Sequence, residues 1–359
     1  METKEKKKIF VGVSGGVDSS VSAALLQEQG HDVVGVFIRT WQPDWTPCTW
    51  KDERRDAMRV CAHLDIPFIE LDLEKEYKQG VADYMIEEYR AGRTPNPDVM
   101  CNKEVKFGGF LKWALEHDAD AIATGHYAQN IFNEKTDMYE MHKGKDDGKD
   151  QSYFLWTLTQ DQLSKSLFPV GHLEKSTVRE LAEKFELPTA AKKDSQGICF
   201  IGKISMKDFL GHYIDEEKGS VVDVDGNVIG EHNGALFFTL GERHGFTVTK
   251  KGTDDAPYYI VAKNVKDNTI TVSQNSDTGN TNSQEIHLES VSWMSAVPNM
   301  GGSFTGQIRY HGGQKPFTIA GMKNTYMVIK LEHTDSTVAA GQSFVMYKGT
   351  QCLGGGVIQ

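Results

Sequence analysis

A stretch rich in glycine and serine, residues 12–20, offers the first candidate chemistry. It follows an apolar run that predicts a buried strand, and it precedes Val21, Ala24 and Leu25, whose spacing predicts a helix facing a core. Glycines at such a turn let the backbone approach a ligand closely, and the start of the helix offers unpaired N–H groups to an anion. Because the sequence contains no Walker pattern with its lysine, the stretch predicts a phosphate-binding loop of another kind.

Two cysteines lie in segments that are rich in turn-forming residues. Cys101 ends the segment 92–101, whose two prolines and two Asx residues predict a rigid, non-helical loop, and Lys103 would favour an exposed thiolate. Cys199 follows Gly197 and two lysines, again in a predicted turn. The residues alone leave open whether either thiol is reactive or simply buried. No C-x-x-C spacing occurs, so we expect no zinc site and interpret the other cysteines as structural: Cys48, Cys61 and Cys352.

The elements that must position these residues alternate between strand and helix from residue 8 to about residue 125. Such alternation predicts a parallel sheet with right-handed crossovers, in which ligands bind beyond the carboxyl ends of the strands. The glycine-rich loop, Ile38 after the second apolar run, and Gly125 with His126 after the last one are therefore expected to converge. The polar segment 134–151 predicts a loop or a flexible flap.

The pattern changes to short β-rich pieces beyond about residue 205, separated by Asp-Gly and glycine-rich turns. We therefore predict an α/β domain over residues 1–205, a small β-rich central domain over residues 206–280 and a C-terminal β-barrel over residues 281–359.

The composition is that of an ordinary globular protein, with 359 residues of which 39% are hydrophobic and 25% charged. A net charge of −11 argues against a generally basic nucleic-acid-binding surface, but it is compatible with a local RNA-binding patch. The sequence shows no apolar run of about 18 residues, no signal peptide and no transit segment. We therefore expect no membrane contact and a cytoplasmic location, which suits the sparse cysteines.

Several motifs occur in a characteristic order along nearly the whole chain. This order resembles that of the tRNA-specific 2-thiouridylase family, in its bacterial or organellar form, within the PP-loop ATP pyrophosphatase superfamily. The resemblance implies a Rossmann-like PP-loop domain followed by the two β domains. The motifs are Ser-Gly-Gly-Val-Asp-Ser at 14–19, Gly-Arg-Thr-Pro-Asn-Pro-Asp at 92–98, Cys-Asn-Lys at 101–103, Ala-Thr-Gly-His-Tyr at 123–127, Lys-Asp-Gln-Ser-Tyr-Phe at 149–154, Lys-Asp-Ser at 193–195, Gly-Ile-Cys-Phe-Ile-Gly at 197–202, Arg-Tyr at 309–310, Gly-Gln at 341–342 and Cys-Leu-Gly-Gly-Gly at 352–356.

The resemblance implies ATP-dependent 2-thiolation of the wobble uridine, U34, in tRNAs for Lys, Glu and Gln. Transfer of AMP to the C2 oxygen would make that oxygen a good leaving group and release pyrophosphate. Asp18 would help to position Mg²⁺ on the phosphates of ATP, although an acid at this place also suits a helix start. Sulfur would arrive as a persulfide on Cys199, from a cysteine desulfurase or a sulfur-relay protein. Cys101 would attack as a nucleophile or resolve the persulfide through a disulfide, and the resemblance does not choose between these routes.

The resemblance also implies two sets of binding residues. Without it, the Asn-Pro-Asp segment is equally a simple turn, a lone histidine is more often structural, and a lysine in a charge-rich flap is normally solvated. ATP would be bound by Gly12, Val13, Ser14, Gly15, Gly16, Val17, Asp18, Ser19, Ile38 and Gly125. The target base would contact Asn96, Pro97 and Asp98, and the rest of the tRNA would contact His126, Lys149, Asp150, Gln151, Arg309, Tyr310 and Gln342.

Other adenylating enzymes of the superfamily are the main alternatives. An amidotransferase-type synthetase or a lysidine synthetase needs no pair of reactive thiols, so Cys101 and Cys199 argue against both. A 4-thiouridine synthase would use a persulfide but is expected to have different RNA-binding and sulfur-carrier domains. A non-catalytic, nucleotide-gated RNA-binding module is the alternative from another class, and the complete PP-loop with both cysteines disfavours it.

Overall fold

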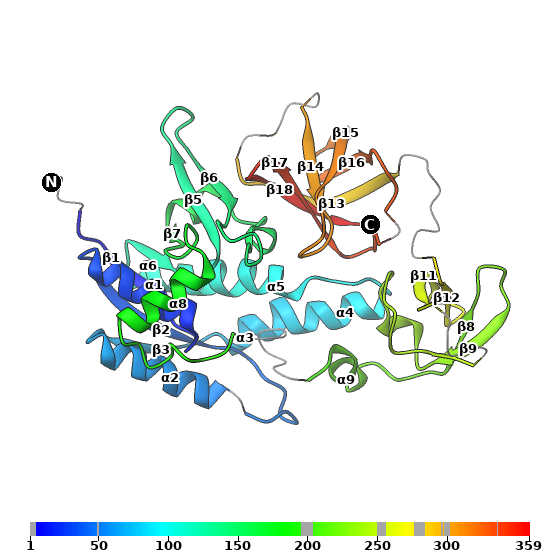
Figure 1. Ribbon diagram of the computed structural model, residues 1–359, viewed down its shortest axis with the longest axis horizontal. Helices are drawn as coiled ribbons and strands as arrows, with labels where there is room; N and C mark the ends of the chain where they lie inside the picture. Colours follow the sequence, from blue (N-terminus) through cyan, green and yellow to red (C-terminus); the bar gives the residue numbers. More distant parts are fainter. Residues whose placement is uncertain are drawn as a thin grey trace.

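The computed structural model describes residues 5–48, 50–194, 204–249, 256–275, 284–295, 297, 302–335 and 337–359. An α/β part, a β-barrel and a small β-rich part make up the structure, and the helical segments that contain α4 (Tyr84–Arg90) and α5 (Pro97–Met100) extend from the α/β part toward the small β-rich part (Figure 1). This arrangement confirms the predicted fold class. Within the described ranges, no helix has both the length and the apolar character needed to cross a membrane.

A parallel sheet of five strands forms the centre of the α/β part. Its strand order is β3-β2-β1-β4-β7, so β1 lies in the middle, with β2 and β3 on one side and β4 and β7 on the other. An order of this kind brings the loops after the central strands to one edge of the sheet. The strands are β1 Lys8–Gly12, β2 Asp32–Arg39, β3 Phe68–Asp72, β4 Ala121–Ala123 and β7 Ser166–Leu167.

Helices cover both faces of this sheet because successive side chains of a strand point to opposite sides. Ile9 and Val11 pack with Ala57 and Cys61 on one face, and Phe10 belongs to the core on the other face. Gly35 is required beneath Cys61, since a Cβ there would lie 2.3 Å from the Cys61 Sγ. The helices are α1 Val17–Glu28, α2 Trp50–His63 and α8 Lys175–Lys184, then α3 Glu74–Tyr77, η1 Lys78–Asp83, α4 Tyr84–Arg90, α5 Pro97–Met100, η2 Cys101–Phe110 and α6 Leu111–Glu116.

A β-hairpin occupies part of the segment that we predicted to be a flexible loop over residues 134–151. Its strands are β5 Ala128–Asn133 and β6 Met138–Lys143, and β6 pairs with β18 Gln351–Ile358 at the end of the chain. The loop prediction is therefore wrong for 138–143. Although its sequence is largely polar, β6 pairs with β5 on one edge and with β18 on the other, and its Met141 is fully buried between them. Short elements follow at η3 Ser152–Phe154 and α7 Gln160–Ser164.

Six strands close the C-terminal β-barrel, because β13 pairs with both β16 and β18. The glycines of β18 permit two close approaches. A Cβ on Gly354 would lie 2.1 Å from the Ser292 carbonyl oxygen, and one on Gly355 would lie 2.8 Å from the ring of Trp156 in the α/β part. The remaining strands are β13 Glu285–Trp293, β14 Phe304–Gln307, β15 Lys315–Lys323, β16 Tyr326–Leu331 and β17 Ser343–Lys348.

The small β-rich part contains a second five-stranded sheet with the order β10-β9-β8-β12-β11. Only the β8–β12 pair in it is parallel. A short helix, α9 Met206–Gly211, precedes the sheet, and η4 Ala235–Phe237 lies between two strands. The strands are β8 Gly219–Val222, β9 Val228–His232, β10 Thr247–Val248, β11 Tyr259–Asn264 and β12 Thr269–Ser273.

Candidate functional site

The loop between β1 and α1 has the geometry of an anion-binding turn. Gly15 has a φ of +74°, and a Cβ there would lie 2.5 Å from the Glu53 carbonyl oxygen of α2, so conformation and space both demand glycine. Gly16 is the N-cap of α1, and its lack of a side chain leaves the first turn without a side-chain cap. The N–H groups at the start of α1 are therefore available to an anion.

The serines of this loop hold its shape as well as offering donors. The Ser19 hydroxyl accepts a hydrogen bond from the Ser14 backbone N–H at 3.2 Å and lies 3.3 Å from the Ser14 hydroxyl. The Ser20 hydroxyl donates to the Gly16 carbonyl at 2.7 Å and accepts from the Thr189 hydroxyl at 3.1 Å. Ser14 is exposed and Ser19 and Ser20 are buried, so Ser14 is the serine whose side chain faces solvent.

Three of the predicted ATP-binding residues lie together at the carboxyl edge of the sheet. A Cβ on Gly12 would lie 3.9 Å from the Ile38 Cδ1, which places the end of β2 next to the loop. A Cβ on Gly125 would lie 2.7 Å from the Ser19 backbone nitrogen and 2.9 Å from the Asp18 carbonyl carbon. Gly125 therefore lets the segment after β4 approach the first turn of α1 without a gap.

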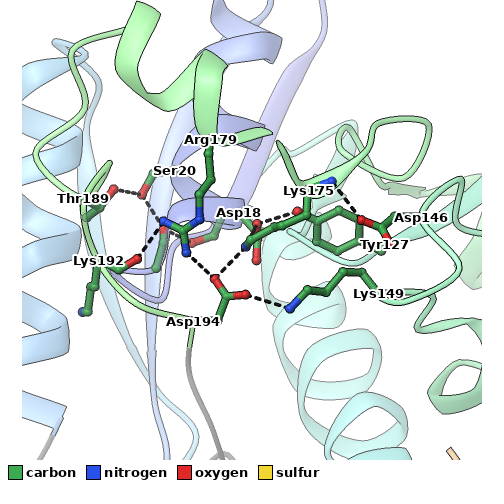
Figure 2. A network of polar contacts seen from close by, with 12 residues as sticks. Asp18, Ser20, Tyr127, Asp146, Lys149, Lys175, Arg179, Thr189, Lys192 and Asp194 are labelled. Carbon is green, nitrogen blue, oxygen red and sulfur yellow. Dashed lines mark hydrogen bonds and ion pairs between the residues drawn. The ribbon is translucent and has the colours of Figure 1, made fainter. Parts of the chain in front are cut away.

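Asp18 lies at the centre of a polar network beside the loop (Figure 2). Its Oδ1 accepts hydrogen bonds from the Tyr127 hydroxyl at 2.7 Å and from the Lys175 Nζ at 2.6 Å. Burial, together with the neighbouring charge of Asp18, raises the pKa of Tyr127, so this hydroxyl remains a donor. Lys175 was not among the site residues predicted from the sequence. Its pattern with Arg179, two cations one turn apart at the start of an amphipathic helix, could have indicated an anion-binding role.

Asp194 receives three cationic side chains next to the same loop (Figure 2). Its oxygens lie 2.8 Å from the Lys149 Nζ, 2.9 Å from the Lys175 Nζ and 2.6 Å from the nearest Arg179 nitrogen. Burial acts to raise the pKa of Asp194, but the hydrogen bonds from Lys149 and Lys175 outweigh it and hold the pKa at about 2. Lys149, which we predicted to contact tRNA, thus lies beside the loop between β1 and α1.

The segment that precedes Asp194 also contacts the loop between β1 and α1. The Lys192 Nζ donates to the Gly15 carbonyl at 2.9 Å and pairs with Asp56 at 2.8 Å. Arg179 donates to the carbonyls of Ala190 and Lys192 at 3.2 and 3.0 Å. The chain thus runs past the loop immediately before residues 195–203. Cys199, the predicted persulfide carrier, lies in that range, outside the described residues.

Cys101 differs from its predicted setting. Asn96 is the N-cap of α5, accepting from the Val99 N–H at 3.3 Å, and Pro97 occupies the first turn. The helix continues into η2, so Cys101 is helical, and it is 3% exposed within the main core. The predicted non-helical loop is confirmed for residues 92–96 but is wrong for residues 97–101, and the expectation of an exposed thiol is wrong. Asparagine at the N-cap and proline at the first position also start helices.

The remaining cysteines divide into two buried thiols and one exposed thiol. Burial raises the pKa of Cys61 to about 11 and that of Cys352 to about 12, so both remain protonated near neutral pH. Their structural interpretation agrees with this environment. Cys48, which we also expected to be structural, is exposed in the loop before α2.

A second group of predicted residues lies where the α/β part meets the barrel. The Tyr153 hydroxyl donates to the carbonyls of Ile308 and Ser343 at 2.9 and 3.0 Å, and the rings of Phe154 and Tyr310 have centroids 4.4 Å apart. Burial raises the pKa of Tyr310, and the negative charges of Asp150 and Asp98 add to this rise. Segment 149–154 thus connects the loop between β1 and α1, through Lys149 and Asp194, to the barrel.

Most of the polar residues predicted to contact tRNA already have partners within the chain. Arg309 donates to the carbonyls of Leu240 and Thr337, and so connects the barrel to the central part. The Gln151 Oε1 accepts from the Tyr127 N–H at 3.1 Å. Asp150 accepts hydrogen bonds from the N–H groups of Gly144 and Ser152. Gln342 is the exception, since its Oε1 is buried without a hydrogen-bond partner among the described residues.

His126 is a buried, neutral histidine in this structure. It is 7% exposed, its Nδ1 lies 2.7 Å from the Thr124 hydroxyl, and its Nε2 lies 3.3 Å from the Lys106 Nζ. Burial, followed by the positive charge of Lys106, lowers its pKa well below the ordinary value. The ring can position Thr124 and Lys106 but carries no charge toward a phosphate at neutral pH.

Known protein families match almost the entire chain. Models described as the tRNA methyl transferase HUP domain, the tRNA methyl transferase PRC-barrel domain and the aminomethyltransferase beta-barrel domain match residues 7–203, 207–274 and 283–358. The tRNA-specific 2-thiouridylase MnmA of Streptococcus thermophilus is 43% identical over 362 residues, which cover 100% of this chain and 96% of that protein. The protein of the same description from Salmonella arizonae is 44% identical over 99% and 98% of the two chains.

Among solved structures, a 4-thiouridine synthetase in complex with RNA and bound ATP is 20% identical to this chain. The superposition covers 54% of this chain and 44% of that one, with a TM-score of 0.34.

Proposed function

Since the chain belongs to the tRNA-specific 2-thiouridylase family, we propose that it uses ATP to convert the wobble uridine, U34, of tRNAs for Lys, Glu and Gln to 2-thiouridine. The observation that supports this most directly is the loop between β1 and α1, where Gly15 and Gly16 leave the start of α1 open to an anion. The phosphates of ATP would bind there, and the adenine would lie near Ile38 and Gly125 at the same edge of the sheet.

Adenylation of the uracil C2 oxygen is the first chemical step of the proposal. The C2 oxygen attacks the α-phosphorus of ATP, the bond to the bridging oxygen breaks, and pyrophosphate leaves with the electron pair. Mg²⁺ would arrive with ATP, since a metal held through substrate phosphates needs only one or two protein carboxylates. Asp18 offers one carboxylate at the loop, and no cluster of three or more ligand side chains was found in the described part of the chain. The residues present therefore fit a metal that is bound mainly by ATP.

Sulfur transfer is the second step. The outer sulfur of a persulfide on Cys199 attacks C2, and AMP leaves with the electrons of the C2–O bond. The S–S bond breaks when the Cys101 thiolate attacks the Cys199 sulfur, which leaves a Cys101–Cys199 disulfide and gives the electron pair of the S–S bond to the outer sulfur. This attack either follows the bonding of the outer sulfur to C2, which leaves 2-thiouridine, or precedes it, in which case the released HS⁻ attacks C2. Because Cys101 is 3% exposed, both routes require its thiol to become accessible when tRNA binds.

The target base is proposed to enter between the α/β part and the barrel. Asn96, Pro97 and Asp98 lie at the start of α5, and Tyr310 faces the same junction with its ring next to Phe154. An aromatic ring beside a polar segment is suited to stacking a base that has been turned out of its own stack. A cysteine desulfurase or a sulfur-relay protein would supply the sulfur, and the cytoplasm is the proposed compartment.

Nucleoside mass spectrometry of tRNA tests this function. Cells without this protein and without a paralogue should lack 2-thiouridine, and the wild-type chain should restore it. Cys101→Ser and Cys199→Ser should fail to restore it while still binding ATP, and Asp18→Ala should weaken adenylation. Cys48→Ser is the matched control, because Cys48 is exposed and lies outside the proposed chemistry.

Two outcomes would contradict the proposal. Normal 2-thiouridine in the cells without the protein would exclude the activity. Loss of 4-thiouridine, with 2-thiouridine retained, would instead support the alternative of a 4-thiouridine synthase.

A further inference from the structure

Three cations converge on a single carboxylate at the mouth of the phosphate-binding loop (Figure 2). Lys149, Lys175 and Arg179 all contact Asp194, and Lys175 also contacts Asp18. With Asp146, whose carboxylate accepts a hydrogen bond from the Lys175 backbone N–H at 3.0 Å, the three cations are matched by three carboxylates. A small anionic group held by several cationic donors is the arrangement that proteins use for phosphate.

Lys175 is the most enclosed of these cations. Its side chain is 13% exposed, its Nζ lies within 2.6 Å of Asp18 and 2.9 Å of Asp194, and it lies 5.7 Å from the centre of the Tyr127 ring. Removing an ammonium group from water is costly, and a buried ion pair is weak evidence for a role in stability alone. Moreover, a second ion pair, from Lys184 to Glu28, connects α8 to α1 at the other end of their contact, so the packing of these two helices does not depend on Lys175 alone.

The loop itself supplies no cation of its own. Its sequence from Gly12 to Ser20 has glycines, valines, serines and one acid, but no lysine or arginine. An enzyme that breaks the bond between the α- and β-phosphates must stabilise the negative charge that grows on the departing pyrophosphate. Lys175 reaches the first turn of α1 from the start of α8, whereas Lys192, the other lysine that contacts the loop, is paired with Asp56.

We propose that Lys175, assisted by Lys149, forms a binding site for the pyrophosphate group, and that the Asp194 carboxylate occupies this site until the phosphates displace it. The inference rests on the proposed function, because it assigns residues to the leaving group of the adenylation step. Arg179 has a different part, since its contacts to the Ala190 and Lys192 carbonyls hold the segment that bears Asp194. It is a positioning residue.

If pyrophosphate displaces Asp194, substitution of the acid and substitution of a lysine should change pyrophosphate affinity in opposite directions. Removing the charge of Lys175 should weaken pyrophosphate binding, whereas removing the charge of Asp194 should strengthen it, since the carboxylate competes with the ligand. A purely structural role for Asp194 predicts the reverse, because the lysines would then lose the group that orients them.

Calorimetric titration of the full-length chain with inorganic pyrophosphate, and separately with AMP, both in the presence of Mg²⁺, provides the test. Lys175→Met should raise the Kd for pyrophosphate about 10-fold, which corresponds to about 1.4 kcal/mol of binding free energy, and should change the Kd for AMP less than twofold. Lys149→Met should show a smaller loss and Asp194→Asn a gain. Lys184→Met is the matched control, being another ion-paired lysine of α8.

Lys175→Arg keeps the charge and should retain pyrophosphate binding, which separates loss of charge from a failure to fold. Unchanged pyrophosphate binding in Lys175→Met, or weaker binding in Asp194→Asn, would overturn the inference. Neither titration uses tRNA or sulfur, so the inference can fail while the wild-type chain still forms 2-thiouridine. Failure of the wild-type chain to form 2-thiouridine would instead reject the proposed function.

Discussion

Replacing Gly125 by alanine should displace the start of α1 and so impair ATP use. The added Cβ would lie 2.7 Å from the Ser19 nitrogen, 2.9 Å from the Asp18 carbonyl carbon and 3.1 Å from the Asp18 Cβ. All three atoms belong to the first turn of α1, whose N–H groups face the proposed phosphates. The backbone of Gly125 has no positive φ, so the effect comes from crowding alone.

The size of this effect follows from the distances. Bringing the closest contact to an ordinary 3.4 Å requires a shift of 3.4 − 2.7 = 0.7 Å between two stretches of backbone. Overpacking of this kind costs about 1–3 kcal/mol, and a misplacement of about 1 Å at a reacting centre can cost about 10²-fold in rate. We therefore expect Gly125→Ala to form 2-thiouridine ~10–100-fold more slowly.

Initial rates of 2-thiouridine formation, calorimetric ATP affinity and thermal unfolding should be measured on the same preparation. Gly313→Ala is the control, since a Cβ there has no atom within 4 Å. The reasoning is refuted if Gly125→Ala retains both the rate and the ATP affinity of the wild-type chain. A loss of stability without a loss of ATP affinity would also refute it, because the crowded atoms belong to the turn that we propose to bind ATP.

Two further predictions concern the junction with the barrel and the response to acid. Tyr153→Phe removes both hydrogen bonds to the Ile308 and Ser343 carbonyls, so it should lower the free energy of unfolding by about 1–3 kcal/mol in denaturant titrations, and an unchanged midpoint would contradict it. His126 has a lowered pKa in the folded chain, so the unfolded chain binds its proton first and stability falls as the pH drops below the ordinary value of 6.5, by up to about 1.4 kcal/mol per pH unit. His126→Gln should therefore flatten the decline of unfolding free energy between about pH 6.5 and 5, and an identical slope would argue against a buried neutral ring.

The sequence predicted the features that depend on strand order and on local backbone rules. The alternation of strands and helices is enough to predict a parallel sheet, and the carboxyl-edge rule then brings Gly12, Ile38 and Gly125 together without any knowledge of their side chains. The glycines of the loop could be predicted from local backbone rules, since Gly15 has the positive φ and the close approach that glycine permits.

Features that depend on partners far along the chain were beyond prediction. Lys175 contacts Asp18 across 157 positions, and only the way α8 packs against α1 decides which lysine reaches the loop. The setting of Cys101 was mistaken for a different reason. Asparagine and proline favour both turns and helix starts, and the helix that follows resolved the ambiguity in favour of a helix start.

The pairing of β6 with β18 sets the order in which the protein can be completed during its synthesis. His142 pairs with Gln351, which the ribosome adds 351 − 142 = 209 residues later. At about 5–20 residues per second, the hairpin waits roughly 10–40 s for its partner strand. During that time β6 presents an unpaired edge, which is the kind of edge that recruits other chains. The nascent protein thus remains open to misassembly through this edge until translation is nearly complete, after the α/β part has already been synthesised.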